Sequence, residues 1–194
     1  MKILNLYAGI GGNRALWGED VEVVAVEYDA EIARAYQDRF PNDEVLVGDA
    51  IEYLLENFNK FDFIWASPPC PSHSVIKRSQ YTRDSYKAVL PDPTLYQIVS
   101  FLQLHGRGRK WVVENVKPYY KPWIESTKEL DRHLYWSNFT IGDIETTKDY
   151  IIKFVTIKDS PIDLSIYKIA NKRQVIRNQV NKNVGLHILK ESSK

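Results

Sequence analysis

Short runs of β-branched, aromatic and other apolar residues recur along the first two thirds of the chain, each as long as a typical β-strand. They occupy residues 2–7, 21–26, 44–47, 61–66 and 110–115. The segments between them are long enough for crossover helices, so this rhythm predicts an α/β fold with a doubly wound, mostly parallel sheet and helices on both faces.

Polar or flexible groups lie at or just after the ends of all five predicted strands. In chain order they are Gly9, Gly11 and Gly12, then Glu27, then Gly48 and Asp49, then Cys70, and finally Glu114 and Asn115. The carboxyl ends of parallel strands share one edge of a sheet, and ligands of doubly wound folds bind there. We therefore expect these groups to face a common ligand.

The last third of the chain has a weaker pattern. Residues 134–139 predict a sixth strand and residues 150–157 a further one, while the segments around them are short and poorly periodic. Residues 172–191 carry apolar positions at helical spacing, interrupted by Gly185. This segment predicts a helix, a turn and a final helix.

Composition indicates an ordinary globular protein. The 194 residues suffice for one domain with a full core, and 44% are hydrophobic against 26% charged. No run is long enough for a membrane-spanning helix, and a single cysteine cannot form an internal disulfide, so a cytoplasmic setting is expected. The net charge of +1 gives no global argument for nucleic acid, although residues 77–87 and 168–194 are locally basic.

The glycine loop and two carboxylates suggest a nucleoside-containing cofactor. Residues 8–12, "AGIGG", permit close backbone approach at a strand-to-helix turn, but they lack the dinucleotide and phosphate-loop fingerprints, and a tight turn alone is an alternative. Glu27 is placed to accept hydrogen bonds from ribose hydroxyls, and Asp49 from an adenine amine or, alternatively, as a helix N-cap. A cofactor with adenosine and no pyrophosphate fits, namely S-adenosylmethionine.

Cys70 lies in the segment "SPPCPSHS", between Pro69 and Pro71. Prolines cannot donate to a sheet ladder, so the thiol is expected past the strand, where a substrate can reach it. An inert packing role is the alternative, since lone cysteines are often buried. Activation would need a nearby cation or a lowered pKa, for which Lys77, Arg78 and His73 are candidates.

Three segments, "LNLYAGIGG", "SPPCPSHS" and "VVENV", resemble in order and spacing the signature segments of the cytosine-C5 DNA methyltransferase family. The resemblance covers about residues 3–139 and resumes at "RQVIRNQVNKNVGLHI", which is similar to the family's closing segment. It implies the Rossmann-like fold of S-adenosylmethionine-dependent methyltransferases. It also implies that the target cytosine is flipped out of double-stranded DNA.

The resemblance implies roles for particular residues. Cys70 would add to C6 of cytosine, Glu114 would hold or protonate N3, and Asn115 and Pro69 would shape the catalytic loop. The cofactor contacts implied are Tyr7, Ala8, Gly9, Gly11, Gly12, Glu27, Tyr28, Asp49, Ala50, Pro68, Asn178 and Val180. The contacts implied for nucleic acid are Ser74, Lys77, Arg78, Arg83 and Arg132, although a merely solvated basic loop is the alternative for residues 77–87. No metal site is expected.

Several residues depart from the family pattern. Asn5 stands where an Asp is typical, Arg177 precedes Asn178 where the family has Gly, and the bracing Arg-x-Arg segment is reduced to Arg132-His133. The resemblance divides one domain into residues 1–139 as the catalytic and cofactor-binding core, 140–168 as a reduced target-recognition region, and 169–194 as a segment packing back on the cofactor pocket.

The short recognition region leaves alternatives open. Recognition is either minimal or supplied by a separate subunit or by self-association. An RNA cytosine-C5 methyltransferase acting on tRNA, and a catalytically silent DNA-binding regulator on the same fold, are the competing functions. Retention of Cys70 together with Glu114 argues against the silent regulator.

Overall fold

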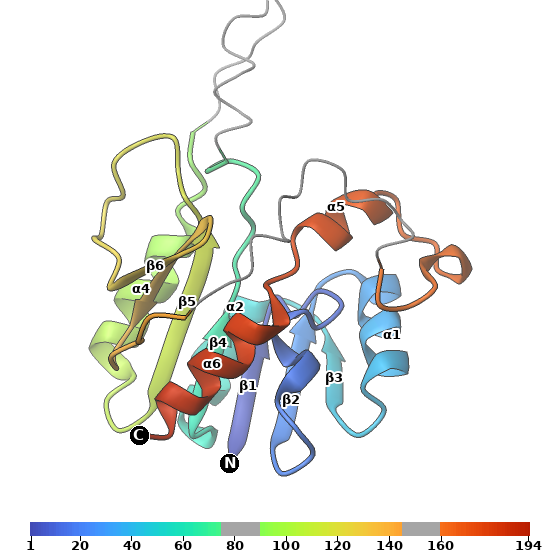
Figure 1. Cartoon of the computed structure of the whole chain (residues 1–194), viewed down its shortest axis with the longest axis horizontal. Helices are drawn as coiled ribbons and strands as arrows, with labels where there is room; N and C mark the ends of the chain where they lie inside the picture. Colours follow the sequence, from blue (N-terminus) through green and yellow to red (C-terminus); the bar gives the residue numbers. More distant parts are fainter. Residues whose placement is uncertain (75–89, 145–159) are drawn as a thin grey trace, which may run out of the picture.

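The computed structural model describes residues 1–74, 90–144 and 160–194, and they form a seven-stranded sheet flanked by helices (Figure 1). The strands are β1 (Lys2–Leu6), β2 (Glu22–Glu27), β3 (Glu44–Val47), β4 (Phe63–Ala66), β5 (Lys110–Val116), β6 (Lys128–Leu130) and β7 (His133–Ser137). The helices are α1 (Ala30–Arg39), α2 (Ala50–Asn57), α4 (Thr94–His105), α5 (Lys172–Arg177) and α6 (Lys182–Ser192), with 3₁₀ turns at Asn13–Leu16, Phe58–Lys60 and Leu164–Ile166.

The strand order is β3-β2-β1-β4-β5-β7-β6, and the five strands from β3 to β5 are parallel. Strand β7 runs antiparallel to both β5 and β6. The order reverses direction at β1 and β4, which makes the space beyond their carboxyl ends the expected binding crevice. The doubly wound, mostly parallel sheet predicted from the sequence is thus confirmed.

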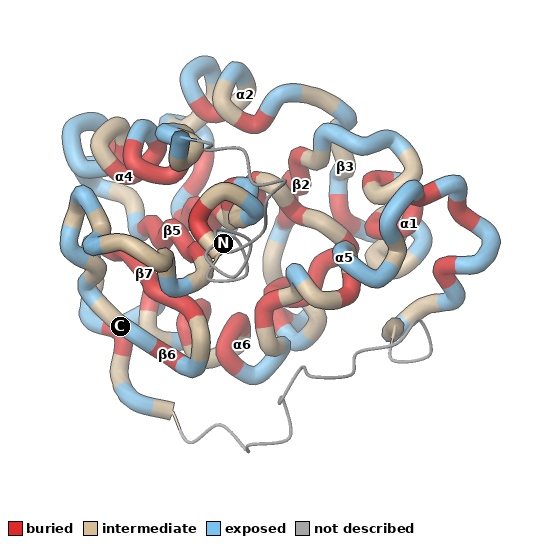
Figure 2. The backbone as a smooth tube through the Cα atoms, turned by 90° about the horizontal axis from the view of Figure 1, so that it is seen from above, coloured by how far each residue is buried: buried red, intermediate tan, exposed pale blue. Residues whose placement is uncertain are grey.

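Helices cover both faces of the sheet (Figure 2). On one face α2 and α4 pack over strand residues such as Leu4, Leu6 and Ile64. On the other face α6 packs over their neighbours in sequence, including Ile3 and Phe63. Because successive side chains of a strand point to opposite faces, strands buried on both sides read as the continuous apolar runs seen in the sequence.

A buried ion pair fixes the segment that follows the glycine loop. Nε and Nη2 of Arg14 donate to the two carboxylate oxygens of Asp43 at 2.9 and 3.0 Å, and the Tyr36 hydroxyl donates to Asp43 at 2.8 Å. The three residues come from the 3₁₀ turn after β1, the residue before β3, and α1. This network anchors the end of the glycine loop to the helix beside it, and loss of one partner would leave a buried charge unpaired.

Some local predictions were wrong. The three-residue strand β6 was missed because it is too short to show periodicity. Gly185 does not interrupt the last helix but lies inside α6, where a Cβ would come within 2.3 Å of the Asn13 carbonyl oxygen. Its missing side chain lets α6 approach the 3₁₀ turn closely, and the indole Nε1 of Trp17 donates to the Gly185 carbonyl at 3.1 Å.

Other sequence predictions fall outside the described residues. These are the strand over 150–157 and the basic loop over 77–87. Within the described part of the chain, no helix combines the length and apolarity that crossing a membrane requires.

Candidate active site

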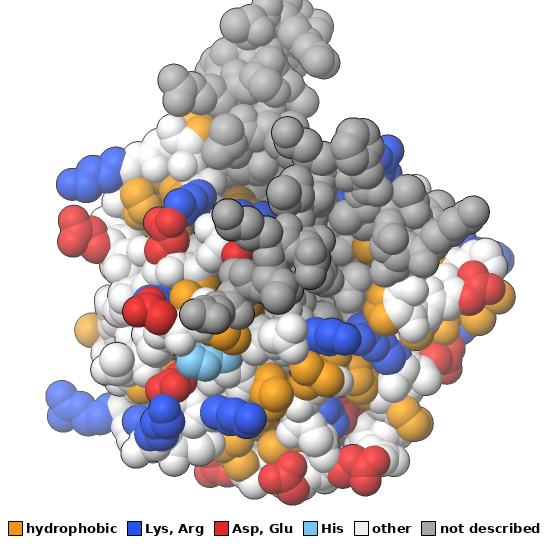
Figure 3. Space-filling model, in the orientation of Figure 1, with side chains coloured by type: hydrophobic (Ala, Val, Ile, Leu, Met, Phe, Trp, Pro, Cys, Tyr) orange, Lys and Arg blue, Asp and Glu red, His pale blue; other side chains and the backbone are white. Residues whose placement is uncertain are grey.

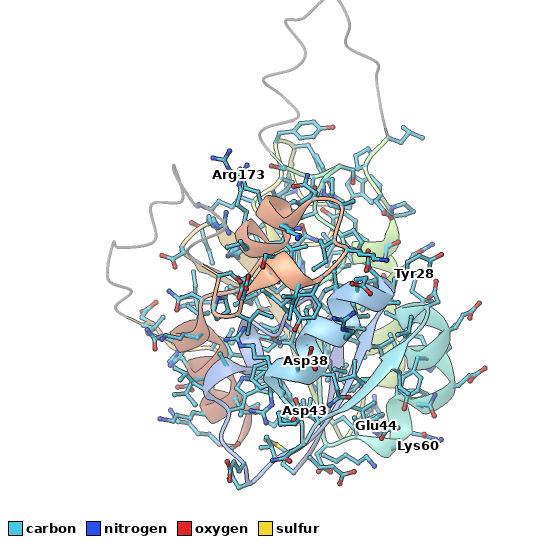
Figure 4. The ribbon with its side chains drawn as sticks, turned by 90° about the vertical axis from the view of Figure 1, so that its right-hand side faces the viewer. Tyr28, Asp38, Asp43, Glu44, Lys60 and Arg173 are labelled. Atoms are coloured by element: carbon cyan, nitrogen blue, oxygen red, sulfur yellow. The ribbon has the colours of Figure 1, made fainter. Side chains whose placement is uncertain are left out.

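A cavity of about 940 Å³ opens at the carboxyl ends of the parallel strands. It brings together nearly all the described residues that the sequence predicted for a site: Tyr7, Ala8, Gly9, Gly12, Glu27, Tyr28, Asp49, Ala50, Pro68, Pro69, Cys70, Ser74, Glu114, Asn115, Arg132, Asn178 and Val180. In Figure 4, Tyr28 and Arg173 lie toward the upper, carboxyl-end side of the sheet, and Lys60 lies near the opposite end. The remaining predicted residues, Lys77, Arg78 and Arg83, lie outside the described residues.

The glycine loop is bent sharply and is held by Glu27. Tyr7 and Gly9 both adopt positive φ angles, 56° and 55°, a backbone conformation that is costly for a bulky residue such as tyrosine. The carboxylate of Glu27 accepts hydrogen bonds from the amides of Gly9 at 2.9 Å and Asp29 at 3.1 Å. Burial raises the pKa of Glu27 although these amide donors oppose the shift. Glu27 thus joins the loop after β1 to the turn after β2.

The three glycines of the loop differ in what they do. Gly11 does not line the cavity, because it faces α1, where a Cβ would lie 2.3 Å from the Phe40 ring. Gly12 does line it, and a Cβ there would meet the Gln179 side chain and the Val180 carbonyl oxygen, each at 2.8 Å. Gly11 therefore packs closely on α1, while Gly12 lets the C-terminal segment approach the glycine loop.

Asp49 is the N-cap of α2, the alternative that the sequence offered. Its Oδ1 accepts from the amides of Ile51 at 2.7 Å and Glu52 at 3.1 Å. Among the described residues no hydrogen bond to Oδ2 is present, and Asp49 borders the cavity. Capping therefore orients the carboxylate and leaves one oxygen for a ligand.

Cys70 is half-buried in the cavity wall, just beyond β4. Burial and the charge of Glu114 raise the pKa of its thiol, while Arg132 and Arg177 act in the opposite direction. Its Sγ lies 3.9 Å from Oδ1 of Asn178, a weak hydrogen bond. The two cations near this thiol are Arg132, just before β7, and Arg177, at the end of α5. Both are far from Cys70 in sequence, so the pattern around Cys70 did not reveal them.

His73 does not supply the activating cation that the sequence suggested. It is fully buried, and its Nδ1 lies 2.5 Å from the Tyr120 hydroxyl. Burial lowers the pKa of His73, so the ring is neutral near pH 7. Packed between Tyr96 and Tyr120, it fixes the turn that follows Cys70.

Glu114 is only 5% exposed at the end of β5. Burial raises its pKa to about 7, against the opposing effects of a hydrogen bond from the Ser67 side chain and the charge of Arg132. The Ser67 hydroxyl accepts from the indole Nε1 of Trp65 at 2.9 Å, so its own proton is free to point at the carboxyl. Near neutral pH about half of the Glu114 side chains carry a proton that can be donated.

Asn115 joins the end of β5 to the segment that follows β4. Its Nδ2 donates to the Pro68 carbonyl at 3.0 Å, and its Oδ1 accepts from the Val116 amide at 2.9 Å. Both side-chain contacts are local to the ends of β4 and β5, and the residue is 1% exposed. Asn115 therefore positions the segment that carries Cys70.

The C-terminal segment closes one side of the cavity. Nη2 of Arg132 donates to the Arg177 carbonyl at 2.6 Å, which joins β7 to the end of α5. Residues of this region that the sequence reasoning did not propose as site residues also line the cavity, namely Asn171, Arg173, Gln174, Val175, Arg177 and Gln179. The only sequence signal was the likeness of 173–188 to a closing segment, which located the region but not these side chains.

Comparisons with known structures find likenesses of low TM-score. DNMT2 from Spodoptera frugiperda (a triple mutant) is 28% identical, with a TM-score of 0.42 over 60% of this chain and 35% of that one. A protein described as a DNA modification methyltransferase from an E. coli prophage is 22% identical, with a TM-score of 0.40 over 62% and 33%. An RNA methyltransferase from Salinibacter ruber, in complex with S-adenosyl-L-homocysteine, is 14% identical, with a TM-score of 0.41 over 70% and 79%.

The chain thus spans about a third of the length of the first two of these proteins. A comparison with curated proteins finds no match. The family model for C-5 cytosine-specific DNA methylase matches residues 1–130, well over half of the chain. The doubly wound sheet is accordingly the Rossmann-like fold of methyltransferases, as predicted. With its cysteine and glutamate at the ends of adjacent strands of that sheet, the chain belongs to the C-5 cytosine-specific DNA methylase family.

Proposed function

We propose that this protein transfers a methyl group from S-adenosylmethionine to C5 of a cytosine flipped out of double-stranded DNA. The observation that carries the proposal is the placement of Cys70 and Glu114 in one cavity, at the ends of the adjacent strands β4 and β5. A nucleophile and an acid that titrates near pH 7 are the two groups needed to activate a pyrimidine ring.

The cavity residues fit S-adenosylmethionine. A loop with close backbone approach at Gly9 and Gly12 lies beside two carboxylates, Glu27 and Asp49, which would accept from ribose hydroxyls and from the adenine amine. The exposed ring of Tyr28, beside Glu27 on the rim, offers a surface on which adenine would stack. When bound, this cofactor would supply an electrophilic methyl group for carbon C5.

The chain's own residues would make C5 nucleophilic. The thiolate of Cys70 forms a bond to C6, the C5=C6 double bond shifts its electrons toward N3, and Glu114 donates its proton to N3. After C5 has been methylated and has lost its proton, the Cys70–C6 bond breaks and Glu114 recovers its proton from N3. The proton that C5 loses passes to solvent water.

The protonation states of the two groups suit these roles. Glu114 with a pKa of about 7 retains a proton for N3 near neutral pH. Cys70 begins as a thiol, because burial disfavours the thiolate, and the charges of Arg132 and Arg177 stabilise the thiolate once it forms. The thiol therefore releases its proton to solvent water before its sulfur attacks C6.

Covalent trapping tests this proposal. Duplex DNA carrying 5-fluorocytosine, incubated with the protein and S-adenosylmethionine, should give an adduct that survives denaturant. Fluorine takes the place of the C5 proton and cannot be removed by a base, so the Cys70–C6 bond cannot be eliminated. Cys70→Ala should give none, and Glu114→Gln should form the adduct at least about 100-fold more slowly. Lys60→Gln, at the opposite end of the sheet, should behave like the wild type.

The alternative outcomes separate the competing functions. An adduct on 5-fluorocytosine RNA and none on varied DNA would assign the protein to RNA. Cofactor binding with no adduct on either nucleic acid would overturn the catalytic proposal and favour a silent regulator. An adduct that persists in Cys70→Ala would show that another nucleophile attacks C6.

A further inference from the structure

Two positively charged arginines line the cavity near Cys70, the candidate nucleophile. Arg132 stands before β7 and Arg177 ends α5, and both line the cavity that holds Cys70. The Arg132 side chain reaches the α5 terminus, where its Nη2 donates to the Arg177 carbonyl at 2.6 Å. Burial lowers the pKa of Arg132, the charges of Glu114 and Cys70 oppose this shift, and the charge of Arg177 adds to it.

No carboxylate of the described residues forms an ion pair with either arginine. Arg177 also makes no side-chain hydrogen bond within residues 1–74, 90–144 and 160–194. Glu27 and Asp49 belong to the cofactor side of the cavity, where backbone amides hold them. Glu114 is the acid whose charge acts on Arg132, but its pKa of about 7 leaves it about half protonated near neutral pH. Two arginines that share this side of the cavity with a single, half-protonated acid leave an excess of positive charge there, which suits an anion.

The face of the molecule that carries α6 does not share this excess of positive charge. On the face that carries α6, basic and acidic side chains are interspersed (Figure 3). The net charge of the whole chain is only +1. The two arginines are therefore a local feature of the cavity and not part of a generally basic molecule.

The chemistry of the proposed reaction identifies the anion. C6 of a cytosine, which Cys70 attacks, is bonded to N1, and N1 carries the sugar. The sugar and its phosphates must therefore lie close to the thiol, on the side opposite the exocyclic amine. A guanidinium binds a phosphate through two parallel N–H donors, and two guanidinium groups beside Cys70 suit one phosphodiester.

We propose that Arg132 and Arg177 form a binding site for a backbone phosphate next to the target nucleotide, an inference that rests on the function proposed above. The segment between β7 and α5, which holds the reduced target-recognition region, is short. Arg177 would therefore supply part of the substrate binding. Its charge holds the flipped nucleotide so that C6 faces the Cys70 sulfur.

Salt dependence tests the charge. Binding of a duplex that the protein traps covalently should be measured by fluorescence anisotropy at several salt concentrations, in the Cys70→Ala background to prevent adduct formation. Each phosphate contact contributes about 0.9 to the slope of log K against log salt. Arg177→Gln should lower the slope by about one contact, whereas Lys60→Gln, a cation at the far end of the molecule, should not change it.

Neutral phosphates test the position. A methylphosphonate in place of the phosphate on the 5′ or the 3′ side of the target removes one charge and keeps the sequence. One of the two should weaken binding by about 10-fold in the Cys70→Ala protein. Its effect should be clearly smaller once Arg177→Gln is added, because only Arg132 is then left to contact that phosphate. Arg132→Gln should couple to the same phosphate.

The failure of this inference can be told from failure of the proposed function. If no nucleic acid is trapped, the function falls and this inference falls with it. If a duplex is trapped but neither methylphosphonate weakens binding, or if the effects of methylphosphonate and Arg177→Gln simply add, the phosphate site is overturned. A slower rate of Cys70 alkylation in Arg177→Gln with an unchanged salt slope would also overturn it, because the arginine would then act on the thiol alone.

Discussion

Nε2 of His133 lies 3.4 Å from Oε1 of Glu114, and both side chains are buried, at 9% and 7% exposure. Burial and the neighbouring Arg132 lower the pKa of His133 to about 3, while burial raises that of Glu114 to about 7. Between these values both groups are uncharged. The pair is therefore a neutral contact near pH 6 and not a salt bridge, although the geometry alone resembles one.

This neutrality matters for the chemistry proposed for Glu114. A fixed positive charge in van der Waals contact with the carboxyl would favour its ionised form and lower its pKa. The imidazole of His133 fills the space beside Glu114 without that charge. The cation that remains nearby, Arg132, is directed instead at the Arg177 carbonyl.

Glu114→Gln should change how stability depends on pH. The folded-state pKa of about 7 lies above the ordinary value of 4.5, so the folded protein binds the proton more tightly than the unfolded chain. That contribution is complete below about pH 4.5 and is lost as pH rises through 7. Glutamine cannot ionise, so the variant should be more stable than the wild type at pH 8.5, by at most on the order of 3 kcal/mol. Urea unfolding at pH 5.5 and 8.5 measures the free energy of unfolding of both proteins. The same difference between variant and wild type at the two pH values would contradict the prediction.

The reactivity of the single cysteine should report its surroundings. Burial and Glu114 raise the pKa of Cys70, so alkylation by iodoacetamide should rise with pH at a higher midpoint than for a free cysteine. Arg177→Gln should move the midpoint up, and Glu114→Gln should move it down, because these charges oppose each other at the sulfur. Cys70→Ala is the blank, since no other cysteine exists. If the midpoint of alkylation moved in the same direction in both variants, this electrostatic account would be refuted.

The sequence located the strands and the groups that follow them, because both are local properties. A buried parallel strand is a continuous apolar run, and glycines or prolines mark its end, as at Gly9 and Pro69. From that rhythm alone, the edge of the sheet that holds Cys70 and Glu114 could be predicted.

What the sequence could not supply depends on contacts between distant segments. The approach of Arg177 to Cys70 requires α5 to fold back over the sheet, and nothing in the basic stretch around it marks one arginine from the next. The neutrality of His133 follows from burial beside Arg132, which no spacing reveals. His73 looked like a candidate because it is near Cys70 in sequence, yet its ring packs against Tyr120.

Gly185→Ala should destabilise the protein although alanine is the better helix former. A Cβ at this position would lie 2.3 Å from the Asn13 carbonyl oxygen and 2.8 Å from the Asn13 Cα, which are backbone atoms that cannot rotate away. We expect a loss of about 1–3 kcal/mol in the free energy of unfolding, after the gain of about 1 kcal/mol in helix propensity. Gly142→Ala is the matched control, because its nearest neighbour would be 3.6 Å away. Equal unfolding midpoints for the two variants would show that α6 can move outward freely.

Gly12→Ala should weaken cofactor binding more than it weakens the fold. The added Cβ would lie 2.8 Å from both the Gln179 Cβ and the Val180 carbonyl oxygen, so the segment that closes the cavity must shift. Isothermal titration with S-adenosylmethionine should show an affinity at least about 10-fold lower, equivalent to about 1.4 kcal/mol. Gly48→Ala also borders the cavity, but its Cβ would meet nothing within 4 Å, so its affinity should stay close to that of the wild type. If Gly12→Ala binds the cofactor as tightly as the wild type, the contact between the glycine loop and residues 179–180 does not shape the cofactor site.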